Sequence, residues 1–148
     1  MAPSDEFAYN DWKFAPVRRA GAYINVSGVV VGRAPDGPTP ETFQAASRAA
    51  IEILRAILQA LRADFADVVM INTFHDRSAP EFGSTRQVKF DAFRKIQEEF
   101  MTAPHPAWTA VGTGGLIRER GIMEVQMIAY SPQTKLNRYV RRESCILD

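Results

Sequence analysis

The chain has 148 residues, of which 46% are hydrophobic and 24% charged, and its formal net charge at pH 7 is +1. Composition and length are typical of one globular domain spanning residues 1–148, with an N-terminal arm at 1–20 and a C-terminal tail at 131–148. The near-neutral charge argues against a nucleic-acid partner or an anionic membrane, because neither would be attracted over a distance. Since no apolar run is long enough to span a membrane and the start lacks a signal-peptide pattern, we expect a cytoplasmic protein.

The chain offers few ligands to a metal ion. Cys145 is the single cysteine, and only His75 and His105 could add imidazole ligands. We therefore expect no disulfide within the chain, no metal site and no cofactor. Cys145 stands fourth from the end, in the outline of a prenylation motif, but the terminal Asp148 is not a usual acceptor. An unmodified tail is the simpler interpretation.

The first half of the chain predicts a strand followed by a long helix. Residues 22–31 form a β-branched run that alternates between two faces, and the arm before it could add an edge strand. After a Pro/Gly-rich loop at 34–38, Thr39, Pro40 and Glu41 have the composition of a helix start. The apolar residues that follow recur at spacings of three and four: Phe43, Ala46, Ala50, Ile53, Leu54, Ile57 and Leu61.

The second half predicts three strands and a shorter helix. Residues 68–74 form a strand, and the polar segment 75–87 after it is long enough to be a functional loop. A helix follows this loop, and its apolar positions are Val88, Ala92, Phe93, Ile96 and Phe100. Two more strands are predicted after the helix, at 107–113 and 122–130. This order predicts an α+β fold in which two helices cover one face of a mixed sheet.

The other face of the predicted sheet combines apolar and polar side chains. Alternation in the last strand separates Met123, Val125, Met127 and Ala129 from Ile122, Glu124, Gln126, Ile128 and Tyr130. In the first strand it separates Ala22, Ile24, Val26 and Gly28 from Tyr23, Asn25, Ser27, Val29 and Val31. A solvent-exposed sheet face would carry more charged side chains than this one does. Burying a few hundred Å² of its apolar surface would stabilise an assembly by several kcal/mol, at about 25 cal/mol per Å². We therefore expect subunits to pair through this face, with Glu124 facing a wet cavity between them.

Five segments carry a resemblance to a known family: Ile24–Gly28, Ala66–Val69, Phe90–Phe100, Pro106–Val111 and Met123–Ala129. In their order and spacing they resemble the Rid family, also called YjgF, whose founding activity is hydrolysis of enamines and imines to carbonyl compounds and ammonia. The resemblance implies a homotrimer with a fold like that of the small trimeric chorismate mutases. It also implies a small-molecule ligand in a cleft between subunits.

Carried over to this chain, the resemblance keeps two site residues and loses others. Ser27 matches the strand serine, and Glu124 matches the glutamate thought to position the hydrolytic water. The family arginine that holds the substrate carboxylate falls at Trp108, the nearby cysteine at Ala110, and the helix asparagine at Arg94. Loss of a bidentate arginine contact, about 1.5–3 kcal/mol, would weaken an amino-acid-like substrate by about tenfold to a few hundredfold. We therefore expect a non-standard substrate.

The replacements have alternative roles. Trp108 could stack on a planar ligand or fill the space that the arginine left, and Arg94 could supply the lost charge or stay solvated. Thr109, next to Trp108, and Phe14, which stands roughly where the family has a tyrosine, complete the substrate-binding candidates.

Glu124 is the catalytic candidate, as a base or acid toward water or an imine nitrogen. Its alternative role is an ion pair between subunits, with Arg118 or Arg120 as the partner. Ser27 could orient a ligand or close a backbone contact, since no His/Asp relay is present to make it a nucleophile.

Three functions follow from these residues. The first is a homotrimeric enamine or imine hydrolase, and the second is a small-molecule-binding homologue without catalysis. The third, a ribonuclease or translation inhibitor, has little support from a chain with net charge +1 and no basic stripe.

Overall fold

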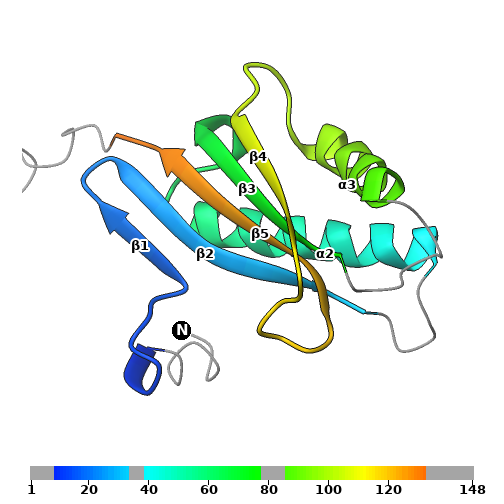
Figure 1. Ribbon diagram of the computed structural model, residues 1–148. Coiled ribbons are helices and arrows are strands. Elements are labelled where there is room, and N and C mark those ends of the chain that lie inside the picture. Colours follow the sequence, from blue (N-terminus) through cyan, green and yellow to red (C-terminus); the bar gives the residue numbers. More distant parts are fainter. Residues whose placement is uncertain (1–8, 34–38, 78–85, 133–148) are drawn as a thin grey trace, which may run out of the picture.

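The computed structural model describes residues 9–33, 39–77 and 86–132 (Figure 1). Their elements are β1 (Val17–Ala20), β2 (Tyr23–Gly32), α2 (Pro40–Ala60), the 3-10 turn η1 (Phe65–Asp67), β3 (Val68–Asp76), α3 (Arg86–Phe100), β4 (Ala107–Thr113) and β5 (Gly121–Tyr130). This order confirms the predicted α+β fold, and β1 is the edge strand that the arm was expected to add. The loop at 34–38, most of the 75–87 loop and Cys145 lie outside the described residues.

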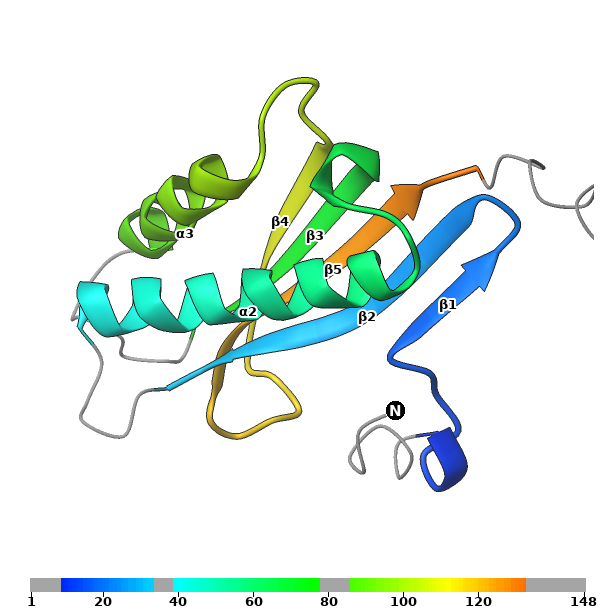
Figure 2. The ribbon, with the colours of Figure 1, turned by 180° about the vertical axis from the view of Figure 1, so that it is seen from behind.

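The five strands form one mixed sheet in the order β1-β2-β5-β3-β4. All neighbours are antiparallel except β3 and β4, which are parallel and joined through α3. Figure 2 shows α2 and α3 in front of the sheet, on the same face, as predicted. Neither helix is long and apolar enough to cross a membrane.

The core lies between this face and the helices. The side chains of β5 expected to point there are fully buried: Met123, Val125, Met127 and Ala129. They pack with apolar residues of β2, α2, β3 and α3, including Ile24, Val26, Leu54, Leu58, Ile71, Phe93 and Ile96. The prediction of which face of β5 contacts the helices is confirmed.

The long helix begins as predicted but turns a slightly different side to the core. Thr39 is its N-cap, with Thr42 N–H donating to Thr39 Oγ1 over 3.2 Å, and Pro40 occupies the first turn. Ile53, expected in the buried stripe, is 51% exposed, whereas Ile51 is buried. Two residues turn a helix by about 200°, so only one of the two isoleucines can face the sheet.

The shorter helix, α3, also turns a different side to the core than its apolar pattern predicted. Val88, expected to be buried, is 43% exposed, and the next residue, Lys89, is 6% exposed. The helix begins at Arg86, two residues before its first predicted apolar position.

A β-bulge interrupts β2 where it pairs with β5. The pairs Val26–Met127 and Val29–Val125 leave two residues, 27–28, opposite a single residue of β5. Such an insertion reverses the alternation of side chains from there on, because one strand gains a residue that the other lacks.

The bulge corrects the predicted faces of β2. Val29 and Val31 were expected on the uncovered face but share the helix side with Val125 and Met123, and Val31 is 0% exposed. Gly28, expected on the helix side, instead directs its Cβ position toward Glu124.

Ile122 also differs from its predicted environment. It lies between the pairs Val31–Met123 and Gly32–Gly121, at a second register shift, and is buried.

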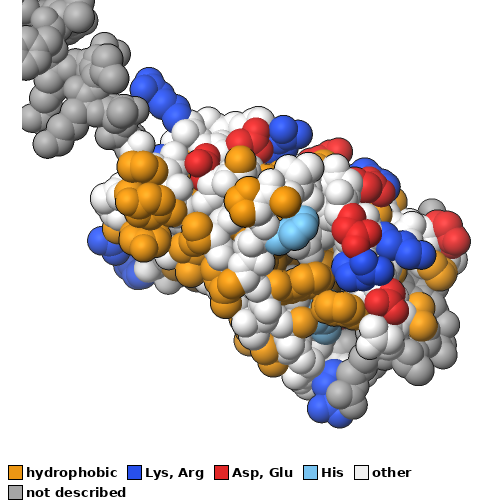
Figure 3. All heavy atoms as spheres, turned by 90° about the horizontal axis from the view of Figure 1, so that it is seen from above, with side chains coloured by type: hydrophobic (Ala, Val, Ile, Leu, Met, Phe, Trp, Pro, Cys, Tyr) orange, Lys and Arg blue, Asp and Glu red, His pale blue; other side chains and the backbone are white. Residues whose placement is uncertain are grey.

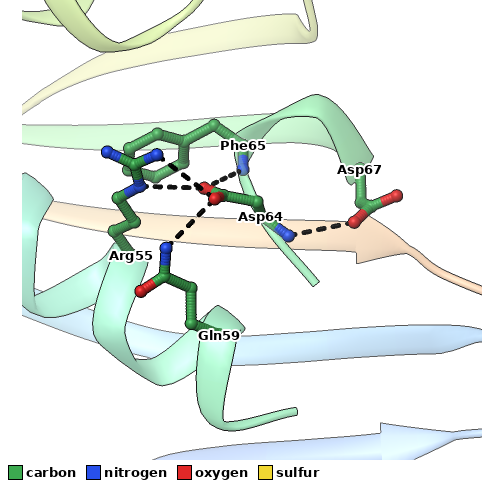
Figure 4. Close-up of polar contacts among 5 residues, drawn as sticks. All are labelled: Arg55, Gln59, Asp64, Phe65 and Asp67. Atoms are coloured by element: carbon green, nitrogen blue, oxygen red, sulfur yellow. Dashed lines mark hydrogen bonds and ion pairs between the residues drawn. The ribbon is translucent and has the colours of Figure 1, made fainter. Parts of the chain in front are cut away.

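A polar cluster fixes the connection from α2 to β3 (Figure 4). Arg55 donates two hydrogen bonds to the Asp64 carboxylate, over 3.0 and 3.2 Å, and Gln59 and the Phe65 N–H donate one each. Asp64 N–H in turn donates to Asp67, which closes a capping box around η1. Burial raises the pKa of Asp64, but the hydrogen bonds from Arg55, Phe65 and Gln59 together have the larger, opposite effect. The pKa of Asp64 therefore lies below its ordinary value.

Candidate functional site

Glu124 projects from β5 onto the uncovered face. Its register partners are Val30 on β2 and Phe74 on β3. A Cβ atom at Gly28 would lie 1.6 Å from Oε1 of Glu124, so the carboxylate occupies the space that the missing side chain leaves. Within the described residues this carboxylate accepts no hydrogen bond and pairs with no cation, which leaves it available to water, a ligand or a second subunit.

Ser27, in the same bulge, holds the arm against the sheet. Its hydroxyl donates to the Ala15 carbonyl and its N–H donates to the Pro16 carbonyl, each over 2.8 Å. The hydroxyl proton is therefore committed, and toward a ligand Ser27 Oγ can act only as an acceptor.

A cavity of about 800 Å³ lies between the arm and the uncovered face. Phe14, which is 44% exposed, lines it together with Ser27, Arg18, Asn25 and Gln126. These amide, hydroxyl and guanidinium groups give the cavity a polar wall, and Phe14 adds an aromatic one.

A second cavity, of about 330 Å³, lies along β2 beyond Val26, the last residue of β2 that pairs with β1. Ser27 and Gly28 line it beside Arg118 of the β4–β5 loop, and Ile53 and Ile57 of α2 form an apolar wall. Ser27 thus contributes to both cavities, whereas Glu124 lines neither of them.

Trp108 lies on the opposite, helix-covered face of the sheet. Its indole N–H donates to Thr73 Oγ1 over 3.0 Å, and its ring stacks on Phe90 at a centroid distance of 4.8 Å. Phe93 meets the same ring edge-on at 5.9 Å. These contacts pack Trp108 between β3 and α3.

The Thr73 hydroxyl also lies 3.0 Å from Nε2 of His75. Burial, and secondarily the charge of Lys89, lower the pKa of His75 below 6.5. Lys89 is itself buried and donates to the Asp76 carbonyl over 3.3 Å. The burial of Thr73 and Asp76 on β3 and of Lys89 on α3 was not predicted, because a single polar residue within an element gives no signal of its burial.

Arg94 shares a third cavity, of about 220 Å³, with Trp108 and His105. Its guanidinium pairs with Glu98, one turn later on α3, and both side chains are largely exposed. Figure 3, seen from above, shows charges of both signs interspersed on this side of the molecule, beside exposed hydrophobic side chains. Thr109 is exposed on the uncovered face, opposite Asn72, and lines none of the three cavities.

The candidate residues therefore form two groups. Glu124, Ser27 and Phe14 lie on or beside the uncovered face, whereas Trp108 and Arg94 lie on the helix side. The sheet separates the groups within one chain. Among the described residues no three His, Cys, Asp or Glu side chains gather as metal ligands would.

Comparisons with known proteins identify the family of this chain. A sequence model of the endoribonuclease L-PSP family matches residues 8–131. The chain belongs to this family, also called the YjgF or Rid family. The RutC family protein YjgH of Escherichia coli K12, one relative, is 31% identical over 125 residues, which cover 84% of this chain and 88% of YjgH.

Solved structures of Rid-family proteins share the fold. The structure of YjgH has 30% identity and a TM-score of 0.63, and the match covers 85% of this chain and 89% of that one. A YjgF/YER057c/UK114 family member from Mycobacterium tuberculosis has a TM-score of 0.65 at 18% identity, over 88% and 95% of the two chains. RidA from the Antarctic bacterium Psychrobacter has a TM-score of 0.59 at 22% identity, over 79% and 87%. At these last two identities the likeness concerns the fold alone.

Proposed function

We propose that this protein is a homotrimeric hydrolase of an enamine or imine, with its site in a cleft between subunits. The observation that carries the proposal is the Glu124 carboxylate, which lies over Gly28 on the uncovered face without a protein partner among the described residues. A carboxylate placed beside open space and free of an ion pair can take a proton from water. Glu124 is also the residue that matches the water-positioning glutamate of the family.

The proposed reaction uses one water and no cofactor. Glu124 accepts a proton as the water oxygen attacks the carbon of the protonated C=N bond, which gives a neutral carbinolamine. The carboxylic acid then gives this proton to the nitrogen. As the C–N bond breaks and the C=O bond forms, the carboxylate takes the hydroxyl proton and passes it to the departing ammonia, so that a carbonyl compound and ammonium leave. An enamine enters the same sequence after it is protonated on carbon.

Glu124→Gln tests this role because glutamine keeps the shape of the side chain but cannot accept the proton. We expect the rate of ammonia release from freshly generated imines to fall about 100-fold or more, as for other general bases. Glu119→Gln, in the exposed loop before β5, is the matched control and should retain the rate. A wild-type trimer inert toward a broad panel of imines, or a Glu124→Gln protein of unchanged rate, contradicts the proposal.

The alternative is a protein that binds a small molecule without catalysis. It is favoured by the environment of Trp108, which replaces the family arginine and is packed against Phe90 and Thr73, and by the pairing of Arg94 with Glu98. On this hypothesis Glu124→Ala changes ligand affinity, and neither protein releases ammonia. RNA cleavage that survives both Glu124→Gln and repurification would instead favour a ribonuclease.

A further inference from the structure

The cavity of about 800 Å³ between the arm and the sheet has cations in its wall and no carboxylate among the described residues that line it. Its volume lies in the upper part of the range of small-molecule sites, roughly 300–1,000 Å³. Lys13 and Arg18 line it and form no ion pair within the described residues. Asp11, the one acidic residue of the described arm, does not line it. The wall therefore favours a ligand with negative charge.

The third cation of the wall, Arg19, is engaged by the protein itself. Its guanidinium donates to the Ser131 carbonyl over 2.8 Å and to the Leu61 carbonyl over 2.6 Å. Two cations thus remain to contact a ligand directly. This number suits one phosphate group, which carries a charge of about −1.5 to −2 at pH 7.

Gln126 presents hydrogen-bond donors to the same cavity. The Asn72 side-chain amide donates to Gln126 Oε1 over 3.2 Å, and this bond fixes which way the Gln126 amide is turned. Its Nε2 group, which has two N–H donors, has no hydrogen-bond partner among the described residues. Toward a ligand Gln126 is therefore a donor.

Ser27 lies across from Gln126, in the β-bulge, and presents an acceptor. Its hydroxyl proton is committed to the Ala15 carbonyl, so Oγ offers only lone pairs. Side chains directly opposite each other on paired strands lie close together, so the wall offers a donor beside an acceptor. The complementary ligand edge has a carbonyl next to an N–H, which is the edge of a lactam.

An aromatic side chain completes the wall. Phe14 lines the cavity, and Trp12, which does not line it, stacks on the Phe14 ring at a centroid distance of 6.2 Å and an interplanar angle of 22°. Phe14 is thereby supported from outside the cavity. Aromatic side chains of this kind stack on planar heterocycles.

We propose that this cavity binds a nucleoside monophosphate whose base has a lactam edge. Lys13 and Arg18 hold the phosphate, Gln126 and Ser27 pair with the carbonyl and the N–H of the base, and Phe14 stacks on its ring. Glu124 does not line this cavity, so the site goes beyond the proposed hydrolysis and does not depend on it. A polymeric RNA would need a longer basic surface than two cations provide.

The test compares inosine monophosphate (IMP) with AMP, titrated into the full-length protein by calorimetry. The two nucleotides have the same charge and nearly the same shape, but AMP has a ring acceptor beside an amino donor where IMP has the lactam. We expect IMP to bind at least tenfold more tightly, because AMP leaves both polar groups of the wall mismatched. Inosine, which lacks the phosphate, should bind at least tenfold more weakly than IMP.

Gln126→Glu tests the polarity of the wall. The substitution keeps the shape of the side chain and the acceptor for Asn72, but it replaces the free donor with an acceptor. The added charge repels both nucleotides equally, so the measurement is the ratio of their two Kd values. We expect this ratio to invert, so that the variant prefers AMP.

Arg18→Gln tests the phosphate contact. We expect the Kd of IMP to rise about tenfold, the low end for a charge-assisted contact because Arg18 is exposed, and the Kd of inosine to stay within about twofold. Arg120→Gln is the matched control: it removes the same charge from an exposed residue that lines none of the three cavities, and both values should be retained.

Phe14→Leu tests stacking, because leucine stays apolar but has no ring. It should raise the Kd of IMP at least threefold, whereas Phe14→Tyr should leave it within about twofold.

Several results overturn the inference: no binding of IMP to wild type, equal Kd values for IMP and AMP, an unchanged ratio in Gln126→Glu, or an equal loss in Arg120→Gln and Arg18→Gln. A short oligoribonucleotide that binds more tightly than IMP would overturn it in favour of a polymer site. Because these titrations contain no imine, a protein that binds IMP as expected but releases no ammonia supports this site and contradicts only the hydrolase.

Discussion

His75 makes the stability of the fold depend on pH. Its pKa is lowered below 6.5 by burial and by Lys89, so the folded protein holds the imidazole neutral. Below 6.5 the unfolded chain binds a proton that the folded chain does not, until the pH passes the lower folded value. We therefore expect the urea midpoint of unfolding to fall as pH decreases from 7 into this window, and to fall less in His75→Gln.

The control for this prediction is His105→Gln. His105 is exposed in the loop before β4, so its replacement should leave the pH dependence as in wild type. Equal slopes for His75→Gln and wild type would show that His75 does not cause the effect.

Single residues also show what sequence can and cannot predict about the site. The positions of Glu124 and Ser27 follow from the order of short motifs, because those motifs fix the strands on which the residues lie. That Trp108 faces the helices depends on its pairing with Ile71 across a parallel register, which no local pattern encodes.

At the level of elements, the bulge in β2 creates the place where Glu124 lies. In Gly28→Ala the added Cβ would be 1.6 Å from Oε1, so the carboxylate must move. The side chain is flexible at that end, and we therefore expect the folded state to persist while ammonia release falls at least tenfold. Thermal unfolding and the imine assay, measured on the same preparation, separate the two effects.

Gly114→Ala is the matched substitution, because nothing lies within 4 Å of its Cβ position. It should retain both stability and rate. A Gly28→Ala protein with the wild-type rate would mean that the position of the carboxylate over residue 28 is not required.

Elements were predicted more accurately than their faces. Periodicity placed β2, β3, β4, β5 and both helices within about two residues, because each carries an apolar pattern and α2 also carries a capping signal. For β1 the sequence indicated only that the arm could add an edge strand. The bulge was missed because an extra residue in a β-branched run leaves the composition unchanged and alters only the pairing with β5. The rotation of α2, which exposes Ile53, similarly depends on what the helix packs against.

At the scale of the whole molecule, the uncovered face is the surface that we expect subunits to share. Ile128 lies on it, in register with Asn25 and Met70. Ile128→Arg places a charge that would be costly to bury in an interface, so we expect it to dissociate the assembly without unfolding the chain. Light scattering after size exclusion should give three times the mass of one chain for wild type and a lower mass for the variant.

Ile117→Arg provides the comparison, since Ile117 is fully exposed in the β4–β5 loop. It introduces the same side chain at a surface outside the sheet and should retain the wild-type mass. A monomeric wild type, or equal masses for all three proteins, would contradict the expected assembly.

The strand order also determines when this fold can be completed on the ribosome. Of the described strands, β5 is the last in sequence yet central in the sheet, and among them it alone joins the β1–β2 pair to the β3–β4 pair. A nascent chain that ends before Gly121 therefore has two separate strand pairs, each with an open inner edge that can associate with other chains. Completion of the sheet must wait until β5 has left the exit tunnel, and premature termination before this strand should yield an insoluble product.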